Sequence, residues 1–143
     1  MKLLFLDFDG VLHPNFSKTS DYFCHVGSIM EVLDTRTTEL DVIISSSWRF
    51  HYPLNELLGF LPSSLRHLIR DVTPDVEPGP HQRFREILSY VDRIRGTQDW
   101  RALDDDTREF PKGCPQLIVC DGRTGIDHKS AEQLRLWLNS GLR

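Results

Sequence analysis

The chain contains few cysteines, few lysines and no long apolar run. Its three cysteines, Cys24, Cys114 and Cys120, show no paired Cys-x-x-Cys spacing, so the sequence predicts neither a disulfide framework nor a zinc site. No apolar stretch is long enough to span a bilayer, and no membrane partner is expected. Positive charge is not in excess either, because 17 basic residues stand against 21 acidic ones. This balance excludes a general polybasic surface for nucleic acid.

The length of the chain and its first residues set further limits. With 143 residues the chain is long enough for a core that needs neither disulfides nor metals, so we expect one domain over residues 1–143. Its first segment is an apolar strand that leads into Asp7 and lacks the pattern of a signal peptide. Together with the scarce cysteines, this predicts a cytoplasmic protein. Cys120 lies in an apolar run and is expected to be a buried strand residue.

Short apolar segments alternate with amphipathic ones along the chain. Strands are expected at 2–7, 41–45, 100–104 and 117–121. Helices are expected at 28–40, 53–58, 81–94 and 131–139, with a helix that turns into a strand at 65–72. Ser28 with Glu31, and Ser130 with Gln133, have the spacing of capping boxes. The alternation predicts an α/β fold with a doubly wound, mostly parallel sheet and right-handed crossovers, without a separate cap domain.

Two aspartates stand two residues apart at the end of the first expected strand. Asp7 and Asp9 follow the apolar run 3–6 and precede Gly10, which allows a sharp turn. In an extended chain, residues i and i+2 point the same way, so both carboxylates address one site. One can attack phosphorus and form an aspartyl-phosphate, while the other protonates the leaving group and then activates water. The spacing therefore indicates phosphoryl transfer rather than a simple turn cap.

The segment Asp7-Phe-Asp-Gly-Val-Leu12 after an apolar strand resembles motif I of the haloacid dehalogenase (HAD) superfamily. Most members of that superfamily are magnesium-dependent phosphatases. The resemblance implies that Asp7 is the nucleophile and Asp9 the general acid and base. Asp9 also argues against a true dehalogenase, since dehalogenases of the superfamily lack this second aspartate. At the end of the second strand, the family places a Ser or Thr that binds the transferring phosphoryl group, and Ser45 matches best, with Ser46 next.

The family also places a lysine or arginine ahead of the next strand, where it holds the nucleophile and the phosphate. None of the four lysines lies between the serine run and the next acidic strand end. Arg83 takes this role by elimination, at the start of an amphipathic segment whose apolar residues share one helical face. Arg85 is the main alternative, and Lys112, farther along the chain, stays open as well.

Three consecutive acids, Asp104, Asp105 and Asp106, follow the apolar residues of the strand expected at 100–104. Like charges this close repel each other unless a cation or solvent relieves them, and a Mg²⁺ site is the simplest explanation of the cluster. By resemblance to motif IV of the family, Asp104 binds the ion directly. Asp105 binds it through a water molecule or contacts one of its direct ligands. Asp7 and the backbone carbonyl of Asp9 complete this ligand set. Asp106 is expected to cap the following turn.

Further motifs narrow the resemblance. They are Gly10-Val-Leu-His-Pro14, Ser45-Ser-Ser-Trp-Arg49, Arg83-x-x-Glu-Ile87, Leu103-Asp-Asp-Asp106 and Thr124-Gly-Ile126. Together they are similar to those of small, cap-less HAD members, some of whose relatives are appended to RNA-repair proteins. The resemblance implies a magnesium-dependent phosphomonoester hydrolase that acts through an aspartyl-phosphate. It also implies an open site that suits large phosphorylated substrates, such as nucleic-acid ends or phosphoproteins.

Two other interpretations stay open at this point. A phosphoryl transferase or nucleotidase for a small metabolite would use the same residues but must exclude water from the aspartyl-phosphate. Only the short segment 15–25 is available as its flap. A catalytically silent binding module of the same fold need not keep all the acids, so their presence favours an enzyme. Trp48 and Arg49 are either core residues or a platform that stacks on a base and clamps a phosphate.

Overall fold

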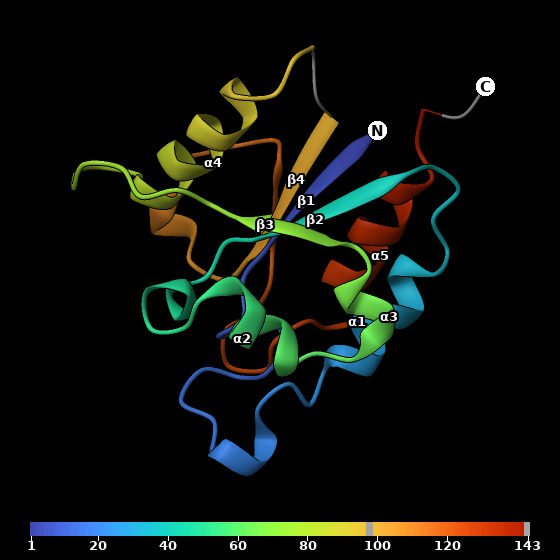
Figure 1. Ribbon diagram of the computed structural model, residues 1–143. Coiled ribbons are helices and arrows are strands. Elements are labelled where there is room, and N and C mark those ends of the chain that lie inside the picture. Colours follow the sequence, from blue (N-terminus) through green and yellow to red (C-terminus); the bar gives the residue numbers. More distant parts are fainter. Residues whose placement is uncertain (97–98, 142–143) are drawn as a thin grey trace.

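Five parallel strands form the centre of the fold. The computed structural model describes residues 1–96 and 99–141, and Figure 1 shows the strands between helices. The strands are β1 (Lys2–Leu6), β2 (Leu40–Ile44), β3 (Ile69–Val72), β4 (Asp99–Asp104) and β5 (Leu117–Val119). Their order across the sheet is β3-β2-β1-β4-β5, and all neighbours are parallel. The doubly wound α/β sheet predicted from the sequence is confirmed, and the described residues contain no separate cap domain.

Helices and single 3-10 turns connect the strands. The α-helices are α1 (Val26–Leu33), α2 (Leu54–Gly59), α3 (Ser63–Arg66), α4 (Gln82–Asp92) and α5 (His128–Leu138), and the 3-10 turns are η1 (Thr19–Asp21), η2 (Ser47–Phe50) and η3 (Thr107–Glu109). Within the two described ranges, none of these helices has the length and apolar composition needed to cross a membrane. Most predicted ends lie within three residues of the observed ones. β5 is shorter than predicted, so Cys120 is buried just beyond the strand.

The side chains of β1 alternate between two core layers. Leu4 and Leu6 belong to the larger apolar cluster, which includes residues of α1 and α5, whereas Leu3 and Phe5 belong to the cluster under α4. All four side chains are buried. Figure 1 shows α4 on one side of the sheet and α1 and α5 on the other. A parallel sheet covered on both faces needs a continuous apolar strand, and this accounts for the run at 3–6.

The start and end of α1 differ from the prediction. The helix begins two residues before Ser28, after His25, whose ring Nε2 donates to Thr124 O at 2.7 Å. Ser28 therefore lies inside the helix and caps nothing, so the first capping box is wrong. The helix also ends at Leu33, and Leu40 opens β2 instead of extending the helical face. The residue before the helix, His25, is thus held by a hydrogen bond to a distant turn and not by a local capping pattern.

α5 begins three residues earlier than predicted. Asp127 is its N-cap and accepts a hydrogen bond from the backbone N–H of Ser130 at 2.9 Å, while Ser130 Oγ accepts from the backbone N–H of Asp127 at 3.0 Å. The predicted box of Ser130 with Gln133 is therefore wrong. Ser130 is instead the second residue of a capping box with Asp127. The Asp127 carboxylate satisfies the backbone N–H of Ser130, which has no partner within the helix.

The strand order fixes where a ligand can bind. From β1 the chain adds β2 and β3 on one side of the sheet, and then crosses to add β4 and β5 on the other side. The direction of sheet growth thus reverses between β1 and β4. In open α/β sheets, ligands bind outside the carboxyl ends of the strands at such a reversal.

Candidate active site

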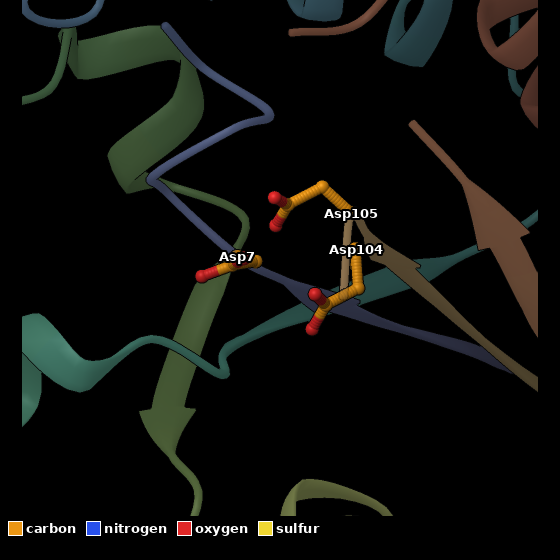
Figure 2. Close-up of side chains that lie close together, drawn as sticks. All are labelled: Asp7, Asp104 and Asp105. Carbon is orange, nitrogen blue, oxygen red and sulfur yellow. The ribbon is translucent and has the colours of Figure 1, made fainter. Parts of the chain in front are cut away.

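Three carboxylates meet at the carboxyl ends of the two central strands. Asp7 follows β1, Asp104 is the last residue of β4, and Asp105 comes next. Figure 2 shows their side chains gathered beside these strand ends. Each residue offers one oxygen, and these oxygens all lie within 4.8 Å of one another. Asp7 and Asp104 are buried, and Asp105 is half-buried.

The register between β1 and β4 brings these acids together. Leu6 is paired with Leu103 in the parallel ladder, so Asp7 and Asp104 are the next neighbours along the two strands. The backbone N–H of Asp7 donates to Leu103 O at 3.2 Å. Because the strands are parallel, residues nearly 100 positions apart in the chain leave the sheet at the same edge.

Arg83 reaches this group from the first turn of α4. Its Nη1 lies 3.2 Å from Asp7 Oδ2 and 2.9 Å from Asp104 Oδ2, and its side chain is 17% exposed. Arg85 points elsewhere and donates to the main-chain carbonyls of the preceding loop. Lys112 lines a different cavity. Of the three cations left open by the sequence, Arg83 is the one that contacts the carboxylates.

The charges in this group do not balance. Burial raises the pKa of Asp7 well above its usual range, and Asp104 adds to this rise while Arg83 opposes it. Burial likewise raises the pKa of Asp104 against the opposing effect of Arg83. Burial by itself would lower the pKa of Arg83, but the two carboxylates outweigh it and the pKa rises. Arg83 thus brings one positive charge against three carboxylates, and a divalent cation with a preference for oxygen ligands fits this set.

Asp105 is held in place by residues from the turns around it. Asn15 Nδ2 donates to Asp105 Oδ2 at 2.7 Å, and the backbone N–H of Asn15 donates to Gly122 O at 2.8 Å. Gly10 has a φ of 78°, and a Cβ at Gly10 or at Gly122 would clash with the Asp105 carboxylate. Gly10 therefore has a second role beside the turn predicted from the sequence. Asn15 was not predicted, because no local spacing connects it to the acid cluster.

The carboxylate of Asp9 lies apart from the other three, between two aromatic nitrogen donors. Trp48 Nε1 donates to Asp9 Oδ2 at 3.0 Å, and His13 Nε2 lies 2.7 Å from Asp9 Oδ1. The other ring nitrogen of the fully buried His13 accepts the backbone N–H of Phe23 at 3.2 Å, so Nε2 carries the proton and donates to Asp9. The Asp9 side chain is 45% exposed, so it is positioned yet accessible.

The structure separates the three serines after β2. The backbone N–H of Ser45 donates to Leu6 O at 2.8 Å, which puts Ser45 beside Asp7. Ser45 Oγ is buried and has no hydrogen-bond partner among the described residues. Ser46 Oγ instead accepts the backbone N–H of Trp48 at 3.2 Å and caps η2, whereas Ser47 lines the cavity at the site. A buried hydroxyl without a partner is costly, so Ser45 is suited to receive a ligand oxygen.

Arg49 does not face the site, and its interpretation as a phosphate clamp is wrong. Its side chain is 5% exposed and forms an ion pair with buried Glu86 of α4. It also donates to Thr73 O at 3.1 Å and to Ser46 O at 2.9 Å. These contacts tie the turn after β2 to the helix that carries Arg83.

The predicted role of Asp106 is confirmed. It is the N-cap of η3 and accepts the backbone N–H of Arg108 at 3.1 Å. Hydrogen bonds to Arg108, from both its side chain and its backbone, lower the pKa of Asp106 despite partial burial. The third acid of the run therefore ends the strand and shapes the turn beside the site.

A cavity of about 440 Å³ opens above the carboxylates, and we call it the reaction cavity. It is lined by Asp7, Asp9, Asn15, Phe16, Ser47, Arg83 and residues 105–108. A larger hollow of about 790 Å³ lies at the opposite end of the sheet, around Met1, Glu39 and Leu40. The larger hollow faces the amino ends of the strands, where ligand sites are not expected in this architecture. The reaction cavity is therefore the candidate active site.

Comparison with known protein families agrees with this geometry. The family model described as "HAD domain in Swiss Army Knife RNA repair proteins" matches residues 3–131. This match covers every residue of the reaction cavity. Searches of curated proteins and of solved structures found no match.

Proposed function

This chain belongs to the family of HAD domains in Swiss Army Knife RNA repair proteins, and from that membership we propose that it is a magnesium-dependent phosphomonoester hydrolase. The observation that carries the proposal is the group formed by Asp7, Asp104, Asp105 and Arg83. It places a buried potential nucleophile within one cluster of oxygen ligands and beside a guanidinium. Phosphoryl transfer depends on such positioning and charge stabilisation.

The backbone carbonyl of Asp9 stays a predicted ligand of the metal. The other ligands would be the carboxylates of Asp7, Asp104 and Asp105, with Asp105 binding directly rather than through water. Their oxygens are close enough to share one ion, and the excess of carboxylates over Arg83 leaves negative charge for it to neutralise. When bound, Mg²⁺ supplies charge stabilisation at the phosphoryl oxygens. Asn15 and the two glycines around Asp105 fix the third ligand, as the supporting contacts of metal ligands commonly do.

The proposed reaction uses Asp7 and Asp9 in sequence. A carboxylate oxygen of Asp7 attacks phosphorus, the bond from phosphorus to the ester oxygen breaks, and Asp9 gives its proton to the departing alcohol. Asp9 then takes a proton from water, whose oxygen attacks the aspartyl-phosphate. Inorganic phosphate leaves and Asp7 is restored. His13 and Trp48 each donate to a different oxygen of Asp9, which leaves a lone pair on each oxygen for proton transfer.

Ser45 and Arg83 are proposed to bind the phosphoryl oxygens. Ser45 Oγ lies buried and unpartnered among the described residues, and Ser45 follows β2 just as Asp7 follows the neighbouring strand β1. Arg83 already contacts Asp7, and its guanidinium has donors suited to phosphate. Both residues act in each half of the reaction, because attack and hydrolysis pass through similar charge distributions on phosphorus.

The shape of the site favours a large phosphorylated substrate, a nucleic-acid end or a phosphoprotein. The segment 15–25, which would have to serve as a flap, projects beyond the carboxyl end of the sheet (Figure 1). Phe16 of this segment lines the reaction cavity and is fully exposed, so Phe16 does not close the cavity off from water. A transferase acting on a small metabolite needs water excluded, and the arrangement gives that alternative less support.

The proposal is tested by hydrolysis of phosphomonoesters with and without Mg²⁺. The wild type should release phosphate from aryl phosphate and from phosphorylated oligonucleotides or peptides, and excess chelator should abolish release. Asp7→Asn should lower the rate by at least about 100-fold, the usual contribution of a catalytic group, while circular dichroism stays unchanged. With ³²P-labelled substrate, acid quenching should trap label on the wild-type protein and not on Asp7→Asn. Phosphate release that persists in chelator, or label on Asp7→Asn, contradicts the proposal.

A further inference from the structure

A second cavity adjoins the reaction cavity at Asp9. It has a volume of about 440 Å³ and is lined by Asp9, Tyr22, Trp48, His51 and Tyr52; we call it the aromatic cavity. Asp9 lines both cavities. The volume lies in the ~300–1,000 Å³ range of small-molecule sites.

The position of Asp9 decides which part of a substrate reaches the aromatic cavity. Under the proposed function, the phosphoryl group lies against Asp7 and Arg83, and the departing oxygen lies next to Asp9. Trp48 Nε1 donates to the Asp9 carboxylate at 3.0 Å, so the indole ring lies next to the place where the departing oxygen would be protonated. The rest of the alcohol therefore extends from Asp9 toward the aromatic cavity.

The walls of this cavity are rings with accessible surface. The ring of Trp48 lies 5.3 Å from that of Tyr22 and 5.9 Å from that of Tyr52. Tyr22 is 38% exposed and Tyr52 is 37% exposed. Behind them, Phe23 and Phe60 pack against Trp48 at 5.3 and 5.7 Å, which holds the indole in place. Such a set of supported, accessible rings is typical of sites that stack on an unpaired base.

We propose that the aromatic cavity binds the unpaired base of the nucleotide whose phosphate is removed. This inference rests on the proposed function, since it assigns the leaving-group side of the same site. A serine or simple sugar phosphate has no flat group to place against three rings. A tyrosine ring is bonded directly to the departing oxygen and would stop at Asp9, whereas a base is separated from that oxygen by the ribose. His51 and the two tyrosine hydroxyls offer hydrogen-bond partners for a base edge.

The base must also be free to enter the aromatic cavity. A base in a duplex is paired along its edge and stacked on its faces, so it enters such a cavity only after it has been unstacked and unpaired. A single-stranded end should therefore be a better substrate than a blunt duplex end of the same sequence.

The test compares kcat/KM for oligonucleotides that differ only at the phosphorylated terminal nucleotide. Both 5′- and 3′-phosphorylated strands are used, each with an intact or an abasic terminal nucleotide, together with the corresponding mononucleotides, a blunt duplex and a phosphotyrosine peptide. Loss of the base should lower kcat/KM by about 5- to 150-fold, the rate equivalent of ~1–3 kcal/mol of base stacking. The duplex should also be slower, and the mononucleotides show whether one nucleotide suffices.

Variants localise the effect. Tyr52→Ala should reduce the ratio between intact and abasic strands, and Tyr52→Phe, which keeps the ring, should preserve most of it. Phe50→Ala is the matched control, because Phe50 is exposed in the adjacent turn η2 and does not line the aromatic cavity. It should leave the ratio unchanged.

The possible outcomes separate the two proposals. Equal rates for intact and abasic strands in an active enzyme, or a phosphotyrosine peptide preferred over every nucleotide, overturn the base site and leave the phosphatase standing. If nothing is hydrolysed, the phosphatase fails, and equilibrium binding of the same strands by fluorescence anisotropy still decides the base site. Tighter binding of the intact strand, lost in Tyr52→Ala, supports it, and equal binding overturns it.

Discussion

Two ring nitrogens hold the Asp9 carboxylate, and both come from residues that are not themselves acids or bases in the proposed reaction. Trp48 offers its indole N–H, and the tautomer of His13 is fixed by the backbone of Phe23. A carboxylate held at both oxygens keeps one orientation toward the leaving group. These two residues are therefore positioning residues for proton transfer.

Trp48→Phe tests this positioning, because it keeps an aromatic ring but removes the indole N–H together with part of the fused ring system. We expect kcat to fall about 10-fold for alkyl phosphates, which need a proton, and less for aryl phosphates, which leave more easily. Trp137→Phe is the matched control. The indole N–H of Trp137 donates to Asp99 Oδ1 at 3.0 Å, and this hydrogen bond lies outside the site. Equal losses on both kinds of leaving group would speak against positioning of Asp9.

Gly10 combines a left-handed backbone with a close approach to a proposed metal ligand. We expect Gly10→Ala to weaken Mg²⁺ binding, because its Cβ would clash with the Asp105 carboxylate. Gly113→Ala is the control: Gly113 has a similar φ of 75°, and a Cβ there would meet none of the described residues within 4 Å. Both variants should lose about 1–2 kcal/mol of stability from left-handed strain. Calorimetric titration should find weaker Mg²⁺ binding in Gly10→Ala alone.

At the scale of the elements, the ion pair between Arg49 and Glu86 joins η2 to α4. Both side chains are at most 5% exposed, and Glu86 stands one turn after Arg83 in the helix. Burial raises the pKa of Glu86, and Arg49 opposes the rise. The pair thus connects the turn that carries Trp48 to the helix that carries Arg83, the proposed phosphate-binding residue.

A double-mutant cycle tests this connection. Arg49→Met and Glu86→Leu should each lower the free energy of unfolding by about 3 kcal/mol, because each leaves a buried charge without its partner. The double variant should recover much of that loss, since two apolar side chains replace the pair. Urea denaturation measures these energies. Additive losses would show that the two side chains do not act as a pair.

For the whole molecule, the acid cluster should link stability to pH and to the proposed metal. The pKa values of Asp7 and Asp104 are raised in the folded protein, so the folded state binds more protons than the unfolded state above the ordinary carboxyl pKa. Stability of the metal-free protein should therefore fall as pH rises through this window. Bound Mg²⁺ requires the deprotonated carboxylates and should reverse this loss.

Thermal unfolding with and without Mg²⁺ at pH 5 and pH 8 tests this linkage. A Mg²⁺ concentration near 100 times the Kd at pH 8 stabilises by about 2.7 kcal/mol at that pH. The same concentration should raise Tm less at pH 5, where protons compete with the ion for the carboxylates. Asp7→Asn should raise the metal-free Tm at pH 8, because it removes a buried charge, and should reduce the shift caused by Mg²⁺. An equal Mg²⁺ shift at both pH values in the wild type would contradict the linkage.

The sequence by itself determined the alternation of strands and helices, the parallel sheet and the placement of Asp7, Asp104 and Asp105 at strand ends. These features follow from periodicity and from the order of elements, which act over a few residues. Family membership, too, could be inferred from short motifs. The starts of α1 and α5 were predicted less well, because α1 follows a histidine held by a distant turn and α5 is capped by an aspartate upstream of the expected serine.

Only the tertiary structure decided which side chains meet. The first turn of an amphipathic helix contains both Arg83 and Arg85, and the packing of α4 on the sheet turned Arg83 toward the carboxylates. Asn15 lies 90 residues from Asp105, and Trp48 lies 39 residues from Asp9. No local spacing records such contacts, because they arise when parallel strands bring distant turns to one edge of the sheet. The acids could therefore be found from the sequence, whereas the residues that hold them could not.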